Sequence, residues 1–105
     1  METKHTAGPW QMMPEEADKD YIRVRGTKLG GRYKIANVPT PVYDGVHSRE
    51  VAETRANAAL IASAPELLRV LMALYDHGYT TCTDHDMVRA VIAKATGDKD
   101  FGLDG

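Results

Sequence analysis

The first half of the chain alternates apolar and polar residues with the two-residue period of a β-strand. Residues 21–25 and 32–38 follow this period on either side of a glycine-rich segment, Gly26 to Gly31, and therefore predict a β-hairpin. A shorter strand is predicted over residues 10–13. Pro39 ends the second hairpin strand, because proline lacks the amide that a strand ladder needs.

The second half of the chain has the period of amphipathic helices, with proline and glycine at their ends. A first helix is predicted over residues 49–62. A second helix begins near Pro65 and stops at Gly78, and a third, over residues 84–96, is capped by Thr83 or Asp84 and ends at the next glycine. Three helices thus follow the strands.

These elements predict an α+β fold, a small antiparallel sheet of about three strands followed by three helices. The chain has 105 residues, of which 43% are apolar and 27% charged, which suits one globular domain. We expect a single domain over residues 1–97 and a flexible tail over residues 98–105. Seven aromatic residues make a light core, so part of the burial is expected to come from self-association.

The helix predicted over residues 49–62 is apolar on two sides. One arc consists of Ala52, Ala56, Ala59 and Leu60, and the other of Val51, Ala58, Ile61 and Ala62. Such a helix is normally covered on both sides, so we expect it to pack on the sheet and also against another helix or a second subunit. The predicted homo-oligomer interface consists of Asn57, Ala58, Ile61 and Ala62. Asn57 is either a buried hydrogen-bond anchor in that interface or a solvent-facing residue.

Pro65 marks a restart of the helical pattern. A proline deep inside a helix costs about 3 kcal/mol, but in the first turn its missing amide is harmless. Ser63 and Glu66 have the spacing of a capping box, in which the serine accepts from the first turn and the glutamate reaches back. The sequence therefore predicts a hinge at Pro65 between two separate helices.

Two short segments carry a sequence signature. Residues 5–10 read HTAGPW, and residues 56–68 read ANAALIASAPELL. They resemble the HTPGPW and NARLIAAAPELL signatures of a family of small, mostly uncharacterised proteins encoded by phages and prophages, with departures at Ala7, Ala59 and Ser63. The resemblance implies a phage accessory gene, a class in which small proteins that blunt host defence are common. It carries over no catalytic residue.

Composition and motifs narrow the chemistry further. Cys82 is the only cysteine, which excludes an intrachain disulfide, and no apolar run has the length of a signal peptide or membrane span. We therefore expect a cytoplasmic protein of the infected bacterial host with no membrane partner. The chain has no GxSxG, P-loop or GxGxxG pattern, so neither an enzyme nor a cofactor is predicted. Irregular spacing of Cys82 from His77 and His85 argues against a metal site.

The charges are unevenly distributed along the chain. The net charge is −2, yet five basic residues and no acidic residue lie between Tyr21 and Tyr43. Alternation places Ile22, Val24, Tyr33 and Ile35 on an apolar face of the hairpin. It places Arg23, Arg25, Arg32 and Lys34 on a basic face, with Tyr21 alongside. This basic face is either a binding site or an ordinary solvated face, since edge strands often carry Lys and Arg to prevent aggregation.

The resulting hypothesis is a non-enzymatic phage counter-defence protein that sequesters a nucleotide-type immune signal. Its expected phosphate contacts are Arg23, Arg25, Arg32 and Lys34, and its expected stacking surface is Tyr21 or Trp10. Trp10 has the alternative role of a core residue. The other functions left open are direct inhibition of a host defence complex by an anti-CRISPR-like protein and an accessory role without defence. A net charge of −2 argues against a general binder of duplex nucleic acid.

Overall fold

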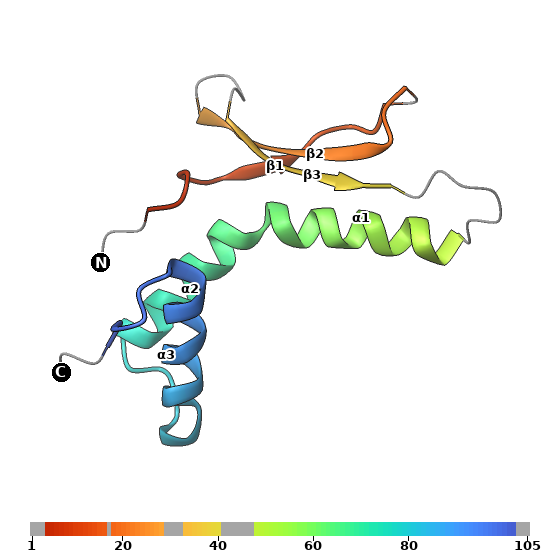
Figure 1. Cartoon of the computed structure of the whole chain (residues 1–105). Coiled ribbons are helices and arrows are strands. Elements are labelled where there is room, and N and C mark those ends of the chain that lie inside the picture. The colour runs from red at the N-terminus through yellow and green to blue at the C-terminus, as the bar shows by residue number, and fades with distance from the viewer. Residues whose placement is uncertain (1–3, 17, 29–32, 41–47, 103–105) are drawn as a thin grey trace. The chain divides into compact units, whose positions relative to one another are not determined.

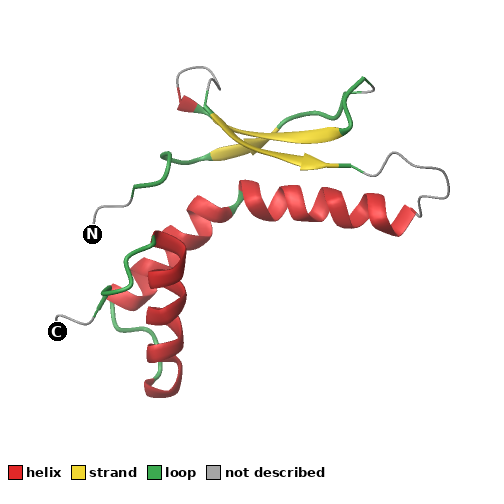
Figure 2. Cartoon of the chain, in the orientation of Figure 1, coloured by secondary structure: helices red, strands yellow, loops and turns green. Residues whose placement is uncertain are grey.

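The computed structural model describes residues 4–16, 18–28, 33–40 and 48–102. Three strands precede three helices, which confirms the predicted α+β class (Figures 1 and 2). The elements are β1 (Trp10–Met12), β2 (Tyr21–Gly26), β3 (Lys34–Pro39), α1 (Ser48–Ala62), α2 (Ala64–Asp76) and α3 (Cys82–Thr96). The chain divides into two compact units: a sheet unit, Thr6–Pro65, and a helical unit, Glu66–Gly105 with Met1–His5.

In the sheet unit the three strands form one antiparallel sheet in the order β1-β2-β3. Ile22 lies opposite Val38, and Val24 lies opposite Ala36 on one side and Met12 on the other. Residues directly opposite each other in an antiparallel pair share a face of the sheet. These five residues therefore lie on one face, which we call the inner face.

Helix α1 packs on the inner face and completes the core of the sheet unit. Ile22 and Val24 are 1% and 0% exposed, and Ala58 of α1 is 0% exposed. Thr54 and Ala62, one turn before and one turn after Ala58, are also buried. The Thr54 hydroxyl donates to the carbonyl oxygen of Glu50 at 3.0 Å, so this buried hydroxyl has a hydrogen-bond partner. Small side chains on this side of α1 allow the helix to lie close to the sheet.

The buried side of α1 corrects the predicted interface between copies. Ala58 and Ala62 were expected to face a second subunit, but they are buried against the sheet of their own chain. Asn57 is exposed and Ile61 is half-buried. Two of the four predicted interface residues thus belong to the core, because the apolar arc that holds them is the one that the sheet covers. Leu60, on the other arc, is 63% exposed.

A β-bulge in β3 changes the predicted alternation. Arg25 lies opposite Lys34 while Val24 lies opposite Ala36, so Ile35 is the extra residue. The apolar partners of β2 on this strand are consequently Ala36 and Val38, and not Ile35 as the alternation predicts. One inserted residue shifts the phase of every following side chain, and the shift cannot be seen in the sequence pattern.

The junction between α1 and α2 places Pro65 in the first turn of α2, as predicted. The predicted capping box is absent. Instead, the Ser63 hydroxyl donates to the carbonyl oxygen of Ala59 at 2.9 Å, and the Ser63 backbone amide donates to the same oxygen at 3.0 Å, so the hydrogen-bond pattern of α1 continues to Ser63. Within the described residues no single helix is long and apolar enough to cross a membrane, although Arg49–Ala62 and Ala64–Asp76 together form a bent pair that could by length and composition alone.

Helix α3 begins earlier than predicted, with Thr81 as its N-cap. The Thr81 hydroxyl oxygen accepts from the Asp84 amide at 3.1 Å, and the hydroxyl donates to the Asp84 carboxylate at 2.8 Å. The sequence prediction placed the cap at Thr83 or Asp84. Several capping residues stand close together here, and the sequence does not show which of them starts the helix.

Removing this cap is expected to destabilise the helical unit. Thr81→Ala removes the acceptor for the Asp84 amide and should lower the free energy of unfolding by about 1 kcal/mol. Thr81→Ser keeps a hydroxyl in the same place and should retain most of the stability. Urea denaturation followed by circular dichroism measures both, and equal losses in the two variants would contradict the capping role.

Within the helical unit, aromatic rings join the end of α2 to the start of α3. The Tyr75 and His85 rings are stacked with centroids 4.6 Å apart, and His85 Nδ1 lies 3.0 Å from the Thr80 hydroxyl. Phe101, in the segment predicted to be a flexible tail, has its ring centroid 5.3 Å from that of Tyr75. Ile92 of α3 is 0% exposed. These contacts define a small core in the helical unit.

Candidate functional site

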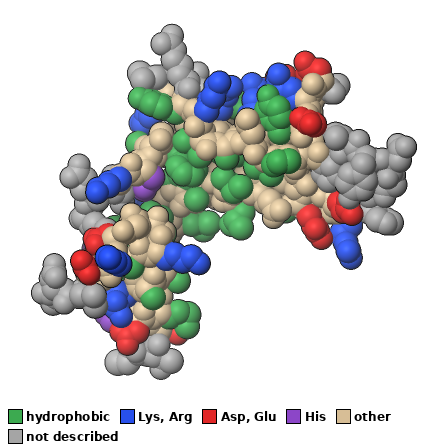
Figure 3. Space-filling view, viewed as in Figure 1, with side chains coloured by type: hydrophobic (Ala, Val, Ile, Leu, Met, Phe, Trp, Pro, Cys, Tyr) green, Lys and Arg blue, Asp and Glu red, His purple; other side chains and the backbone are tan. Residues whose placement is uncertain are grey.

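The outer face of the sheet, opposite α1, gathers polar side chains from all three strands. Register partners fix their placement: Gln11 and Lys34 both lie opposite Arg25, and Asn37 lies opposite Arg23. Tyr21 is two residues before Arg23 in β2 and so shares its face. The outer face thus consists of Gln11, Tyr21, Arg23, Arg25, Lys34 and Asn37. Figure 3 shows Lys and Arg side chains gathered over the strands, with acidic side chains beside them.

Two of the outer-face cations are direct neighbours. Arg25 and Lys34 are register partners across β2 and β3, next to the bulge at Ile35. Side chains in such pairs have Cβ atoms about 5 Å apart, and like charges there are destabilising. Lys34 is exposed and Arg25 is half-buried. Two cations at this spacing present positive charge to an anionic partner that approaches the outer face.

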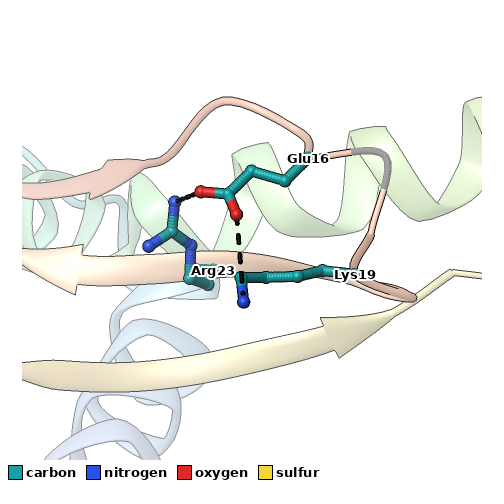
Figure 4. A network of polar contacts seen from close by, with 3 residues as sticks. All are labelled: Glu16, Lys19 and Arg23. Atoms are coloured by element: carbon teal, nitrogen blue, oxygen red, sulfur yellow. Dashed lines mark hydrogen bonds and ion pairs between the residues drawn. The ribbon is translucent and has the colours of Figure 1, made fainter.

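A third cation, Arg23, is held by a carboxylate of its own chain (Figure 4). Arg23 Nη2 donates to Glu16 Oε1 at 2.6 Å, and the other oxygen of Glu16 lies 3.8 Å from Lys19 Nζ. The Arg23 and Glu16 side chains are 21% and 40% exposed. Glu16 therefore already occupies the position that a phosphate would take beside Arg23, and it neutralises part of the positive charge.

Tyr21 supplies an aromatic ring to the outer face. Its ring centroid lies 5.9 Å from Lys19 Nζ, within the range of a cation–π contact. The residue is half-buried. Tyr21 is the aromatic residue that shares a face with Arg25 and Lys34, as the sequence predicts.

Trp10 lies on the other face of the sheet, which corrects its predicted role beside the cations. Trp10 is the register partner of Gly26, and Gly26 is two residues after Val24 in β2. Trp10 therefore lies on the same face of the sheet as Val24, which is the inner face. Its indole N–H donates to the carbonyl oxygen of Thr6 at 3.0 Å, and the residue is half-buried. A ligand bound to the outer face cannot stack on Trp10, because the sheet itself lies between them.

The structure therefore brings together four of the six predicted binding residues. Tyr21, Arg23, Arg25 and Lys34 share the outer face, Trp10 does not, and Arg32 lies outside the described residues. The residues that the sequence analysis missed are Gln11, Glu16, Lys19 and Asn37. Gln11 and Asn37 could have been found only from the register between the strands. The contact of Glu16 with Arg23 could have been found only from the path of the segment before β2.

Comparison with known proteins connects the chain to one phage family. The family model described as Salmonella phage P22 protein Y8K6 matches residues 1–99. No curated protein and no solved structure matches the chain. The match covers the whole sheet unit and most of the helical unit, so it applies to the chain as a whole.

Proposed function

Since this chain belongs to the Salmonella phage P22 protein Y8K6 family, we propose that it is a counter-defence protein that acts by binding an anionic target, without catalysis. Family membership supports the phage setting. The observation that carries the binding proposal is the pairing of Arg25 with Lys34 on the outer face, where two cations stand opposite each other beside a bulge. The outer face is the contact surface in this proposal.

An acidic surface of a host defence protein fits the outer face best. A protein partner needs a broad surface and tolerates cations that are partly compensated, whereas small molecules are usually held in concave sites. Arg23 is compensated by Glu16, and Trp10 is on the inner face. Both facts weaken the predicted phosphate and stacking contacts more than they weaken a protein contact.

Sequestration of a nucleotide-type signal is the second candidate, and Tyr21 is the observation that favours it. Its ring lies on the outer face with Arg25 and Lys34, so stacking and phosphate contacts could come from one surface. In this version Arg23 contributes only after Glu16 is displaced. The variant Glu16→Gln should therefore strengthen nucleotide binding.

The test is capture from an infected host with a tagged chain in three forms. The forms are the wild type, the double variant Arg25→Glu/Lys34→Glu and the control Arg69→Glu, which reverses a charge at an exposed position of α2. Wild type and control should retain a stoichiometric host protein. The double variant should bind it about 100-fold more weakly, because two attractive contacts become repulsive.

Three outcomes separate the candidates. A small ultraviolet-absorbing ligand released on denaturation, together with heat from cyclic nucleotides or ADP-ribose derivatives in calorimetry, would support the second candidate and reject the first. Equal capture by all three forms would reject the outer face as the contact surface. Equal plating of a phage lacking this gene on defended and undefended hosts would reject the counter-defence role.

A further inference from the structure

We infer that the helical unit pairs with a second copy of itself through an apolar surface on α2 and α3. Five large apolar side chains of this unit are roughly half exposed or more: Leu67 54%, Val70 48% and Leu74 42% on α2, and Met87 63% and Val91 49% on α3. Five exposed apolar side chains gathered in one small unit mark an interaction surface. The inference is independent of the proposed function, which uses the outer face of the sheet.

The five side chains lie on one face of the helix pair. At 3.6 residues per turn, those of α2 fall within about 60° of one another and those of α3 within about 40°. In α2 this arc lies about a third of a turn from the side that holds Tyr75, and in α3 it lies about a third of a turn from the side that holds Ile92. The rotation has the same sense in both helices when each is followed along its own chain direction. Tyr75 stacks on His85 across a five-residue connection, so the helices run in opposite directions (Figure 1). When two antiparallel helices face each other through the Tyr75 and Ile92 sides, equal rotations away from those sides bring both apolar arcs to the same face of the pair.

The opposite face of the helix pair is already covered by its own chain. Phe101 packs on Tyr75, and Gly102 lies against Tyr75 and Arg89, where a Cβ added to Gly102 would stand 2.8 Å from Arg89 Cδ. Arg89 is on the other side of α3 from Val91, about 160° away. The C-terminal segment thus closes one face of the pair and leaves the apolar face bare.

The core of the helical unit is small. Among the described residues of this unit, Ile92 is the one hydrophobic side chain that is fully buried. The unit consists of Met1–His5 and Glu66–Gly105, only a little more than the size of about 40 residues below which folded chains usually need disulfides, metals or oligomerisation. Cys82 is the only cysteine of the chain, so no intrachain disulfide is available. Association through the apolar face would bury the five side chains that this unit leaves exposed.

The charges at the rim of the apolar face match those of a second copy. Glu66 borders the face on α2 and Lys94 borders it on α3, about 40° and 20° from their nearest apolar neighbours. With Tyr75 opposite His85, Glu66 and Lys94 lie at the same height on the two helices. A two-fold axis parallel to the helices places α2 of one copy over α3 of the other and each Glu66 beside a Lys94 of the other copy. The product is an antiparallel four-helix bundle.

The first experiment compares adjacent substitutions on α3 by sedimentation velocity of the full chain. Val91→Glu puts a charge on the apolar face and should weaken the dimer at least about 100-fold. Ala90→Glu adds the same charge at an exposed position about 100° around the helix and should leave the dimer intact. The inference would be overturned if the wild type were monomeric at a concentration of about 100 µM. It would also be overturned if the Val91→Glu protein still dimerised.

A charge exchange tests the arrangement with variants that leave the apolar face unchanged. Glu66→Lys and Lys94→Glu should each weaken dimerisation about tenfold, because each replaces two attractive contacts in the dimer by repulsive ones. The double variant should regain the wild-type dissociation constant. Additive losses in the double variant would exclude this pairing of two copies. Circular dichroism of every variant confirms that the helices remain folded.

Discussion

The variant Ala58→Glu is expected to abolish cooperative folding of the sheet unit. Ala58 is 0% exposed where α1 packs on the inner face, so the larger side chain has no space and its carboxylate no water. The expected cost exceeds about 4 kcal/mol, a large part of the 5–15 kcal/mol that typically stabilises a folded protein. Urea denaturation and amide chemical-shift dispersion of residues in β2 measure the effect.

Ala59→Glu is the matched control for this experiment. Ala59 is the next residue of α1 and is exposed, so the same substitution should change the free energy of unfolding by no more than about 0.5 kcal/mol. If Ala58→Glu kept the wild-type stability and changed only the sedimentation coefficient, Ala58 would face another copy and not the sheet. That result would restore the interface predicted from the sequence.

The variant Ile92→Ala is expected to destabilise the helical unit by about 3 kcal/mol. Ile92 is 0% exposed and is the fully buried hydrophobic residue of the described part of this unit, so shortening its side chain leaves a cavity in the core. The lost hydrophobic burial of the removed methyl and methylene groups adds to the cost of the cavity. Urea denaturation followed by far-ultraviolet circular dichroism gives the change in the unfolding midpoint.

A graded substitution at the same site checks the mechanism. Ile92→Val removes one methylene and should cost about 1 kcal/mol, so the two losses should scale with the volume removed. Similar midpoints for the wild type and Ile92→Ala would show that this side chain is not in a packed core. A larger loss for the valine variant than for the alanine variant would point to altered helix propensity.

The helices and strands were predictable because their signals are local. Pro65 falls in the first turn of α2, and Gly97 ends α3 in a left-handed conformation with φ of 76°. Both residues act through their own backbone, without help from distant parts of the chain. The Thr81 cap was harder to predict, because neighbouring residues of the sequence could cap the helix equally well.

The predictions that failed concern which surfaces meet. Two apolar arcs on α1 were visible in the sequence, but only the packing shows that the sheet covers the arc with Ala58 and Ala62. Likewise, the bulge at Ile35 follows from the pairing of two strands and not from either strand alone.

The candidate site shows the same division. Tyr21, Arg23 and Arg25 belong to one strand, so alternation alone puts them on one face. The position of Trp10 depends on the register between β1 and β2, which no local pattern specifies. The Glu16–Arg23 ion pair likewise depends on the path of the chain between two strands.

The bulge at Ile35 also has a consequence for how this gene can change length. Removing a residue from the middle of a paired strand normally turns all later side chains over, which would bring polar residues into the core. Ile35 is the residue that has no partner in β2, and Lys34 and Ala36 already lie on opposite faces. A deletion at position 35 would leave a regular hairpin with the same inner and outer faces. Homologues one residue shorter are therefore expected to carry their gap at this position.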